Sequence, residues 1–521
     1  MKKAALVLLA LALAALVRWP TVAHPDWMPL DPNSPLHTLV ANDLASGGNP
    51  FRIVSLGAPE GLRVRLLAMP LMLVAAALNL VTSPAAAMNL AVWLWVAGTG
   101  VVFAALCKRL GGSPWVGLVV LLGAPPCIQA LGNGQYENIA YAGHALALVG
   151  VMRRKPWEVA LAGLLVGLSS PYQGVALGLL LISCGLFMRQ WKAPAAGFAG
   201  LVVAAVYFAG ILTGGLDPTT AMPAPALGDQ GITVGELFLG GQWSESASAG
   251  ARSWALLHPE PARELGMTWP WVVSKNEGML GFALVGFGVW GLWRERARPV
   301  AKALALAAAA CVVIALGHRL KLTPTTHTVI PLPWLASLWL PGIREMQATS
   351  RFLAMAVFAL GVGSAWALRG RWMLLAPLVV VEGLWFSAAH WPAPVLAMTL
   401  PDVPLADEGP IAVWPGPPAL MPRYHCLTSI ALDRPVAWFQ AEPRDDAPLP
   451  GEGPVRTQAV AKTDRFGRTP EQWLTWSGAK TVLEIQGTFD PLSDRNLDLG
   501  EGICEAAVCV WTTEAAGTAH P

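Results

Sequence analysis

Residues 117–155 read GLVVLLGAPPCIQALGNGQYENIAYAGHALALVGVMRRK, and this stretch decides the fold class. Two apolar runs, 115–131 and 138–152, are joined by the polar turn GNGQYEN and followed by three consecutive basic residues. A spanning helix needs about 20 apolar residues, fewer when its ends snorkel. Lys and Arg in short connections stay on the cytoplasmic side of a membrane. The stretch therefore predicts a helical hairpin that crosses a membrane outward and back.

The composition of the whole chain agrees with this prediction. Of 521 residues, 54% are hydrophobic and only 13% are charged, against about 25% charged in soluble proteins. The 24 Trp against 5 Tyr favour a membrane–water interface, where indole rings gather. With 35 basic and 33 acidic residues, the net charge of +2 provides no field to hold nucleic acid. The composition indicates a polytopic membrane protein with one polar appendage.

The hairpin pattern repeats along residues 1–390. Apolar runs alternate with basic clusters, and the turns on the far side, 132–138 and 169–173, contain no Lys or Arg. About eleven crossings result, with the N-terminus cytoplasmic. The run 66–83, broken by Pro70, is one too many and is predicted to be interfacial or re-entrant. The apolar runs are 4–17, 66–83, 86–106, 115–131, 138–152, 157–170, 172–188, 194–213, 278–293, 303–317, 352–368 and 372–389.

The first apolar run, residues 4–17, has two interpretations. Two lysines, an apolar core and the segment Thr21-Val22-Ala23 would suit a signal peptide cleaved before His24. Arg18, Trp19 and Pro20 interrupt the path to that site, so we favour an uncleaved anchor.

The composition changes after His390. Residues 391–521 contain no spanning run and are rich in Pro, Asp, Glu and Gly, with strand-like stretches at 411–414, 481–485 and 507–511. We predict a small soluble α/β domain on the extracytoplasmic side. An oxidising compartment would allow a disulfide between Cys504 and Cys509. The absence of a CxxC pair argues against a structural zinc site.

Chemistry is expected at the outer face of the membrane. The common nucleotide, hydrolase and metalloprotease motifs are absent, and the cytoplasmic loops are too short to fold into a domain. The outer connections are 18–65, 132–138, 214–277 and 318–351. The first holds Asp26, Asp31, Asp43 and Glu60. A carboxylate there could deprotonate an acceptor hydroxyl or hold a divalent cation. Alternatively, the loop is solvated and its Asp residues cap turns and short helices.

Further polar residues carry similar alternatives. Arg344 and Arg351 lie beside an amphipathic segment and could bind a lipid phosphate in bidentate fashion, or simply snorkel to the headgroups. Glu382 lies near the middle of the last apolar run, where a carboxylate usually faces the bundle interior. For Glu382 we favour a hydrogen-bonded structural role.

Several segments in order resemble the GT-C superfamily of polytopic membrane glycosyltransferases, of the oligosaccharyltransferase and mannosyltransferase type, with their bacterial relatives. An anchor helix and an acidic first outer loop precede SGGNPF and APEGL. The paired helices at 117–155 follow, and then LWLPGIREMQATSRFLAMAVFALGVG before a late helix. VVVEGLWFSAAHWPAPV and GPIAVWPG are similar to the final helix and the start of the outer domain in bacterial members.

The resemblance implies a GT-C-like helical bundle and a sugar donor carried on a polyprenyl phosphate. It implies a catalytic acid in the first outer loop, which falls on Asp31, with Asp26 as the runner-up. The family often has a doubled acidic motif there, and this chain has no adjacent pair. Glu137 occupies a position like the second acid of some members; its alternative role is to cap the helix that follows. A divalent cation would be the cofactor, although the sequence does not determine one.

Three functions remain open at this stage. The first is transfer of a sugar from a polyprenyl-phosphate-linked donor at the outer face of a bacterial inner membrane. The second is a transporter or flippase for lipid-linked saccharide, against which the chain shows no inverted repeat of broken helices. The third is a non-catalytic relative that keeps the fold for envelope biogenesis. The partners in each case are membrane lipid and lipid-linked material, and the sequence does not indicate the oligomeric state.

Overall fold

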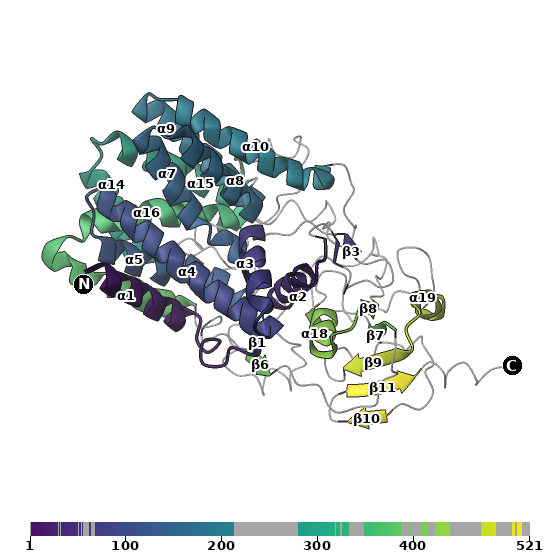
Figure 1. Cartoon of the computed structure of the whole chain (residues 1–521). Helices are drawn as coiled ribbons and strands as arrows, with labels where there is room; N and C mark the ends of the chain where they lie inside the picture. Colours follow the sequence, from purple (N-terminus) through teal and green to yellow (C-terminus); the bar gives the residue numbers. More distant parts are fainter. Residues whose placement is uncertain are drawn as a thin grey trace.

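The structure is a computed structural model, and its described part is mostly helical (Figure 1). The described residues are 2–29, 31, 33–49, 52–53, 55, 62–63, 68–212, 280–317, 319–323, 326–332, 349–387, 391, 395–397, 409–413, 423–437, 470–485, 503–505 and 508–512.

The first part of the chain places one helix in the bundle and several short elements at its end. The first helix, α1, packs against α4 and α5, and the indole N–H groups of Trp93 and Trp391 donate to its carbonyls at Leu11 and Leu16. Helix α3 has 11 residues, a length of about 17 Å. It is too short to cross a hydrocarbon core of about 30 Å unaided, as are several other apolar helices of the described chain, and the interfacial or re-entrant 66–83 segment stays a prediction. The elements are α1 (Lys2–Val17), β1 (Trp27–Pro29), α2 (Ser34–Ala45), β2 (Arg52–Ile53), β3 (Leu62–Arg63) and α3 (Met69–Asn79).

Helices then follow one another through short connections. Most of them begin at a proline, whose missing N–H costs nothing in the first turn. The hydroxyl oxygens of Ser83 and Ser113 accept hydrogen bonds from backbone N–H groups at the starts of α4 and α5. Helices α5 and α6 form a pair bent by 48°. The elements are α4 (Pro84–Arg109), α5 (Pro114–Gly123), α6 (Pro125–Gly132), the 3-10 turn η1 (Tyr136–Asn138), α7 (Tyr141–Arg153), α8 (Pro156–Ser169), α9 (Pro171–Met188) and α10 (Lys192–Leu212).

Helix α16 lies at the centre of the second set of helices, and all of its residues are buried. Glycines bring α14 against it: a Cβ added to Gly291 would lie 1.8 Å from the carbonyl oxygen of Gly363. The carboxylate of Glu382 accepts hydrogen bonds from the N–H groups of Phe282 (2.5 Å) and Ala283 (2.8 Å) and so caps α14. The elements are α14 (Phe282–Arg294), α15 (Pro299–Ala315), β4 (Arg319–Thr323), β5 (Thr326–Pro331), η7 (Thr349–Phe352), α16 (Leu353–Ala367), η8 (Gly370–Leu375) and α17 (Pro377–Phe386).

Helices lie on all twelve predicted apolar runs, but only some of these helices are long enough to span a membrane by themselves. Three described helices are long and apolar enough to cross a membrane by themselves, or four if the bent pair α5 and α6 counts as one span. The other apolar helices have 10–17 residues within the described part of the chain. The helical class is therefore confirmed, and the number of about eleven crossings stays a prediction.

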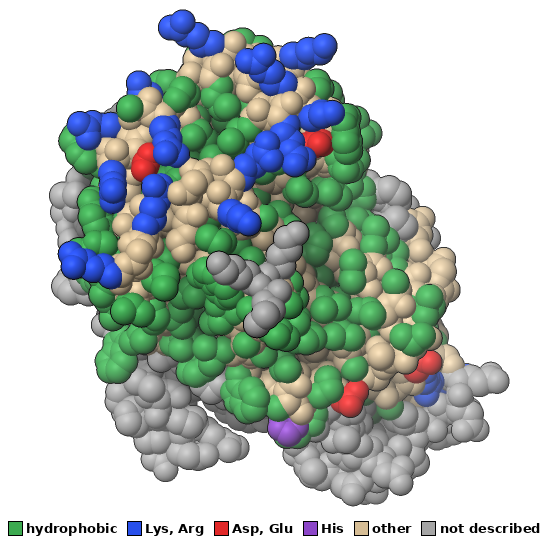
Figure 2. All heavy atoms as spheres, turned by 60° about the vertical axis from the view of Figure 1, so that its left-hand side comes forward, with side chains coloured by type: hydrophobic (Ala, Val, Ile, Leu, Met, Phe, Trp, Pro, Cys, Tyr) green, Lys and Arg blue, Asp and Glu red, His purple; other side chains and the backbone are tan. Residues whose placement is uncertain are grey.

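The two ends of the bundle differ in charge. The predicted basic clusters gather at one end, which we call the basic end, and Figure 2 shows their side chains above an apolar belt. Contacts tie the helix ends together there: the carbonyl oxygen of Leu110 after α4 accepts from Arg298 (2.8 Å) and from the Trp366 indole (3.0 Å). The basic end carries Lys108, Arg109, Arg153, Arg154, Lys155, Arg189, Lys192, Arg294, Arg296, Arg298, Lys302, Arg369 and Arg371.

The described strands after residue 391 lie with the first outer connection, away from the basic end. Strand β6 pairs antiparallel with β1, and α18 packs on α2. A mixed five-stranded sheet has the order β10-β11-β9-β7-β8, with β7 parallel to both of its neighbours. The extent of a separate domain at 391–521 stays a prediction. The elements are β6 (Val395–Ala397), β7 (Ile411–Val413), α18 (Arg423–Leu432), β8 (Val436–Ala437), α19 (Pro470–Ser477), β9 (Thr481–Ile485), β10 (Ile503–Glu505) and β11 (Val508–Thr512).

Cys504 and Cys509 are register partners on the antiparallel strands β10 and β11. Residues paired in this way have Cα atoms about 4.5–5.5 Å apart, a separation that a disulfide can bridge. The predicted bond between them stays a prediction.

Candidate active site

Asp31 lies three residues before the first residue of α2 and is buried, with 6% of its surface exposed. Its Oδ1 accepts hydrogen bonds from the backbone N–H groups of Asn33 (2.8 Å) and Ser34 (2.6 Å), and its Oδ2 accepts one from the Ser34 hydroxyl. Acceptors at this position satisfy N–H groups that the helix itself leaves unpaired. Asp31 therefore fixes the start of α2, and it does so inside the protein rather than in a solvated loop.

The turn between α6 and α7 packs directly on Asp31. The side-chain amide of Asn33 donates to the carbonyl oxygen of Asn133 (2.7 Å), and the hydroxyls of Ser34 and Tyr136 are hydrogen-bonded to each other. Gly134 has a positive φ of 65°, and a Cβ there would lie 2.1 Å from Asp31 Oδ1. Only glycine fits this conformation and this approach. The GNG sequence of the turn thus brings the second outer connection against the first.

Glu137, in the same turn, forms a buried ion pair with Arg351 of η7. The distance from Glu137 Oε1 to a guanidinium nitrogen is 3.0 Å, and the two side chains are 3% and 17% exposed. The guanidinium lies over the ring of Tyr172, 5.1 Å from its centroid, which favours a cation. Glu137 Oε2 is buried and has no hydrogen-bond partner among the described residues. The pair therefore leaves one carboxylate oxygen available inside the protein.

His37 lies one turn along α2 from Ser34, with its ring 5.4 Å from that of Tyr136. Burial lowers the pKa of His37 to about 4; the Asp31 carboxylate opposes this shift and the positive charge of Arg351 adds to it. The imidazole is therefore neutral near pH 7, and its pKa depends on the charges of both Asp31 and Arg351. Its Nδ1 is buried without a hydrogen-bond partner in the described part of the chain.

Burial also shifts the acids of this region. It raises the pKa of Asp31, against the hydrogen bonds from Ser34 and Asn33 and the charge of Arg18. It raises the pKa of Glu137, against the charge of Arg351. The pKa of Tyr136 rises to about 12, so its hydroxyl keeps its proton. A carboxylate with a raised pKa is a stronger proton acceptor when ionised, which suits a general base.

Arg18 closes the region from the side of α1. It is fully buried and donates to the carbonyl oxygen of Leu131 (3.1 Å) and to Asn89 Oδ1 (3.2 Å). Its guanidinium also lies 5.5 Å from the centroid of the Tyr136 ring. Arg18 thereby joins α1, α4 and α6 and supplies a positive charge near Asp31.

Three of the five predicted catalytic or binding residues, Asp31, Glu137 and Arg351, lie in one buried polar region that we call the Asp31 site. Asp26 lies apart from it: its side chain is exposed and accepts a hydrogen bond from the Ser83 hydroxyl (2.7 Å) at the start of α4. Arg344 lies outside the described residues, and its predicted role stays a prediction.

Four members of this region were not predicted as site residues from the sequence: Arg18, Ser34, His37 and Tyr136. The Ser-Pro pair at 34–35 is a typical helix start, and a helix there would have placed His37 one turn beyond Ser34. Tyr136 is the neighbour of Glu137 in a turn already singled out. Nothing local marks Arg18, because its role depends on carbonyl and amide groups more than 70 residues away.

The described residues contain no group of three or more His, Cys, Asp or Glu side chains placed to hold a metal ion. The Asp31 site combines acids with Arg and neutral His, which suits charge-assisted binding of an anion.

Residues 66–316 match glycosyltransferase family 87. This is a GT-C-type family of polytopic membrane glycosyltransferases, so the predicted resemblance is confirmed. None of the curated proteins compared with the chain matches it.

The family 87 match includes Glu137 and the helices from α3 to α15, but it does not extend to Asp31 or Arg351. It indicates a membrane glycosyltransferase. A family 87 enzyme would use a lipid-linked sugar donor and contact membrane lipid. A multi-pass membrane location agrees with the match and with the apolar helices.

Proposed function

We propose that this protein transfers a sugar from a polyprenyl-phosphate donor to an acceptor hydroxyl, at the extracytoplasmic face of a bacterial inner membrane. The observation that carries the proposal is the convergence of Asp31, Glu137 and Arg351, from three distant segments, in one buried polar region. The family 87 match supports sugar transfer as the reaction class.

In the proposed reaction, Asp31 is the general base. The acceptor oxygen forms a bond to the anomeric carbon of the sugar while the bond from that carbon to the donor phosphate oxygen breaks. The acceptor proton moves to the Asp31 carboxylate, whose raised pKa favours its uptake. A positioned carboxylate contributes about 10²–10⁴-fold to such a step.

Arg351 is proposed to bind the donor phosphate and to balance its growing charge as it leaves. Fixed cations are effective at this task when they are preorganised and shielded from water. Glu137 supports that role because its ion pair, at 3.0 Å, holds the guanidinium in place before the donor binds. Arg344 and Asp26 remain candidates for further substrate contacts, on the donor phosphate and near the acceptor respectively.

The proposed side of the membrane is supported by the difference in charge between the two ends of the bundle. The basic end is predicted to be cytoplasmic because it carries the Lys and Arg clusters. The Asp31 site lies at the other ends of the same helices, next to the start of α9 and of α16. This arrangement supports transfer at the outer face.

The deciding experiment compares two buried aspartates of the same region. Asp31→Asn keeps an oxygen that can accept the hydrogen bonds at the start of α2 but removes the base. Asp43→Asn is the matched control, since Asp43 is also buried and accepts from the N–H and hydroxyl of Ser55. Transfer is measured with purified protein and a synthetic polyprenyl-phosphate sugar.

We expect Asp31→Asn to lose transfer by about 10²–10⁴-fold, with unchanged membrane insertion, and Asp43→Asn to retain it. Full activity of Asp31→Asn would overturn the assignment and leave helix capping as the role of Asp31. Donor binding by wild-type protein without transfer to any acceptor would favour the non-catalytic relative, and donor movement across vesicles would favour the flippase.

A further inference from the structure

A cavity of about 430 Å³ lies between α14 and α15, with its mouth at the basic end of the bundle. Both helices pack on α16 and contact each other little, so a groove remains between them with Ala356 and Leu360 as its floor. Its walls are Val285, Val289 and Leu292 on α14, and Ala305, Ala308 and Val312 on α15. This volume falls in the range of ligand sites, about 300–1,000 Å³.

Small residues on α15 keep the groove open. Ala301, Ala305, Ala308 and Ala309 recur at the spacing of one helix face. Ala305 and Ala309 are exposed, and a larger side chain at either position would enter the groove.

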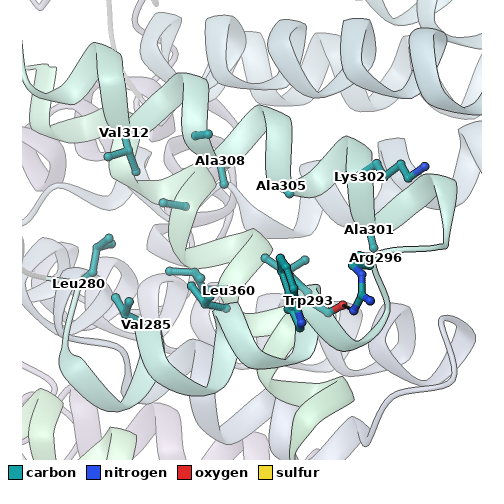
Figure 3. Close-up of a pocket in the computed structure, with 14 residues that line it drawn as sticks. Leu280, Val285, Trp293, Arg296, Ala301, Lys302, Ala305, Ala308, Val312 and Leu360 are labelled. Carbon is teal, nitrogen blue, oxygen red and sulfur yellow. Dashed lines mark hydrogen bonds between the residues drawn. The ribbon is translucent and has the colours of Figure 1, made fainter.

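Two cations stand at one end of an otherwise apolar lining. Figure 3 shows Arg296 and Lys302 at the end where α14 stops and α15 begins, and Leu280 and Val312 at the other. The Arg296 guanidinium lies 4.6 Å from the Trp293 ring and donates to the Trp293 carbonyl oxygen (3.2 Å). The contacts hold it at the mouth of the groove, where Trp is typical of a membrane interface.

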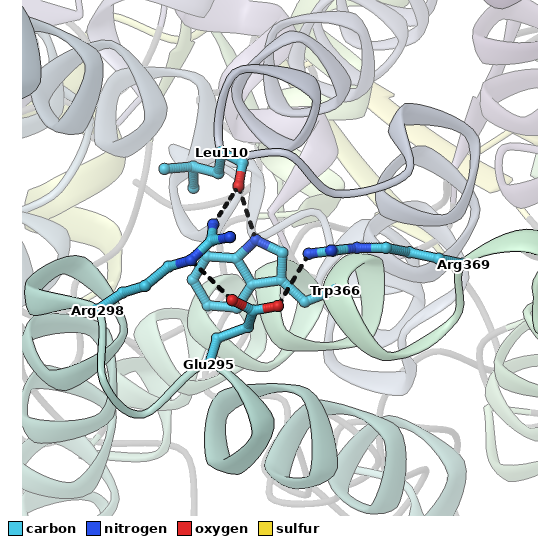
Figure 4. A network of polar contacts seen from close by, with 5 residues as sticks. All are labelled: Leu110, Glu295, Arg298, Trp366 and Arg369. Atoms are coloured by element: carbon cyan, nitrogen blue, oxygen red, sulfur yellow. Dashed lines mark hydrogen bonds and ion pairs between the residues drawn. The ribbon is translucent and has the colours of Figure 1, made fainter.

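The acid next to Arg296 in sequence, Glu295, is paired with other arginines. Arg298 and Arg369 both form ion pairs with Glu295, at 2.7 and 3.2 Å (Figure 4). Within the described part of the chain, no ion pair joins Arg296 or Lys302 to a carboxylate. Glu295 is thus already shared by two other arginines, and the charge of Arg296 and Lys302 at the mouth can attract an anion.

The length of the groove fits a lipid chain. From Arg296 to Leu280 the chain advances by 16 residues, about 24 Å if helical throughout, which exceeds the depth of one leaflet, about 15 Å. An apolar slot of this length with cations at its headgroup end matches an amphiphile with an anionic head. A soluble anion would use the mouth alone and leave the apolar slot empty.

We propose that the α14–α15 groove binds one anionic phospholipid from the leaflet on the basic side, with its phosphate on Arg296 and Lys302 and an acyl chain along the alanine face of α15. This site is separate from the Asp31 site, and the proposal does not rest on glycosyl transfer. The lipid would fill the space between two helices that contact each other little.

The test uses the full-length protein in a nonionic detergent and native mass spectrometry. Phosphatidylglycerol and phosphatidylcholine with the same acyl chains are titrated separately. We expect one phosphatidylglycerol to bind in clear preference to phosphatidylcholine. Each cation near a membrane surface contributes about fivefold to the binding of an anionic lipid, so the double variant Arg296→Gln with Lys302→Gln should weaken it by about thirtyfold.

Matched variants separate this site from general surface charge. Arg189→Gln with Lys192→Gln removes the same two charge types from the same end of the bundle, outside the groove, and should leave binding unchanged. Ala305→Trp should block the groove, whereas Leu306→Trp, at an exposed position outside its lining, should not. Size-exclusion profiles check that each variant is folded.

Three outcomes would overturn the proposal. Equal binding of the two lipids would remove the role of the headgroup charge. Retention of phosphatidylglycerol by Ala305→Trp would remove the role of the groove. Displacement of the lipid by millimolar inorganic phosphate, with phosphate binding unchanged in Ala305→Trp, would show an anion site without a lipid chain.

Discussion

The two ends of the helical bundle each contain a glutamate paired with arginine, and the pairs differ in ways that bear on function. At the basic end, each oxygen of Glu295 has its own arginine, and the Arg298 and Arg369 side chains are 44% and 35% exposed (Figure 4). At the other end, Glu137 and Arg351 are largely buried, and Glu137 Oε2 has no hydrogen-bond partner among the described residues.

The comparison separates a structural ion pair from one suited to chemistry. Exposed pairs are screened by water and contribute about 0–1 kcal/mol each, so Glu295 serves mainly to hold the ends of α14, α15 and α16 together. A buried pair has lost its hydration, and an incoming anion or hydroxyl can interact with it strongly. A glutamate and its arginines thus connect helix ends at the basic end, whereas the Glu137–Arg351 pair is a candidate binding group at the other end.

The largest expected effect is on activity. Arg351→Gln should lower sugar transfer by about a thousandfold, because the leaving phosphate loses its cation. Arg369→Gln, which removes an arginine from the basic end, should leave transfer nearly unchanged. Initial rates with a lipid-linked donor measure both. Equal losses in the two variants would mean that arginines act on activity only through the stability of the bundle.

The next effect concerns stability. Glu137→Gln removes the carboxylate of the buried ion pair with Arg351, and breaking such a pair costs about 3–5 kcal/mol. Glu295→Gln removes a partly exposed partner and should cost about 1 kcal/mol. Thermal unfolding in detergent compares them. If Glu295→Gln proved the more destabilising, the contrast between the ends would be reversed.

The Asp31 site should also make stability depend on pH. The pKa of His37 is 6.5 when unfolded and about 4 in the fold, so the unfolded chain takes up a proton first as the pH falls. His37 therefore costs no stability above pH 6.5 and about 2 kcal/mol at pH 5. The raised pKa values of Asp31 and Glu137 act in the opposite direction, since the fold takes up their protons first.

The comparison is consequently between wild type and His37→Gln, with exposed His24→Gln as the control. Melting temperatures from pH 8 to pH 5 should fall less steeply in His37→Gln, and His24→Gln should follow wild type. Parallel curves for all three proteins would contradict a buried neutral His37.

The smallest expected effect tests which compartment the Asp31 end faces. Cys504 and Cys509 are register partners, and a disulfide closing so short a loop would add at most about 2 kcal/mol. It should form in protein purified from an oxidising compartment and be absent if this end is cytoplasmic. Thiol counting before and after reduction measures the disulfide. Two free thiols without reductant would contradict the assignment of the Asp31 end to the oxidising side of the membrane.

The helical class and the charge difference between the ends followed from sequence because they are local properties. Apolar runs, prolines at helix starts and basic clusters each act within a few residues. The hairpin at 117–155 predicted a helix pair around a polar turn, and the structure has α5 to α7 there. Lengths were less predictable, since the bend between α5 and α6 and the short α3 depend on their neighbours.

In the candidate site, too, some features could be predicted from the sequence and others depend on the tertiary structure. Asp31, Glu137 and Arg351 could be proposed from sequence because acids and arginines in outer connections are few. These three residues lie close together only because segments far apart in the chain contact one another. The same holds for the approach of Gly134 to Asp31 and for the positions of His37 and Arg18 in the site. Glu382 illustrates the same limit: its place in an apolar run predicted a structural role, but only the packing of α17 against α14 made its carboxylate the cap of Phe282 and Ala283. Burial sets the hydration and the pKa of such groups, and burial is a property of the assembled bundle alone.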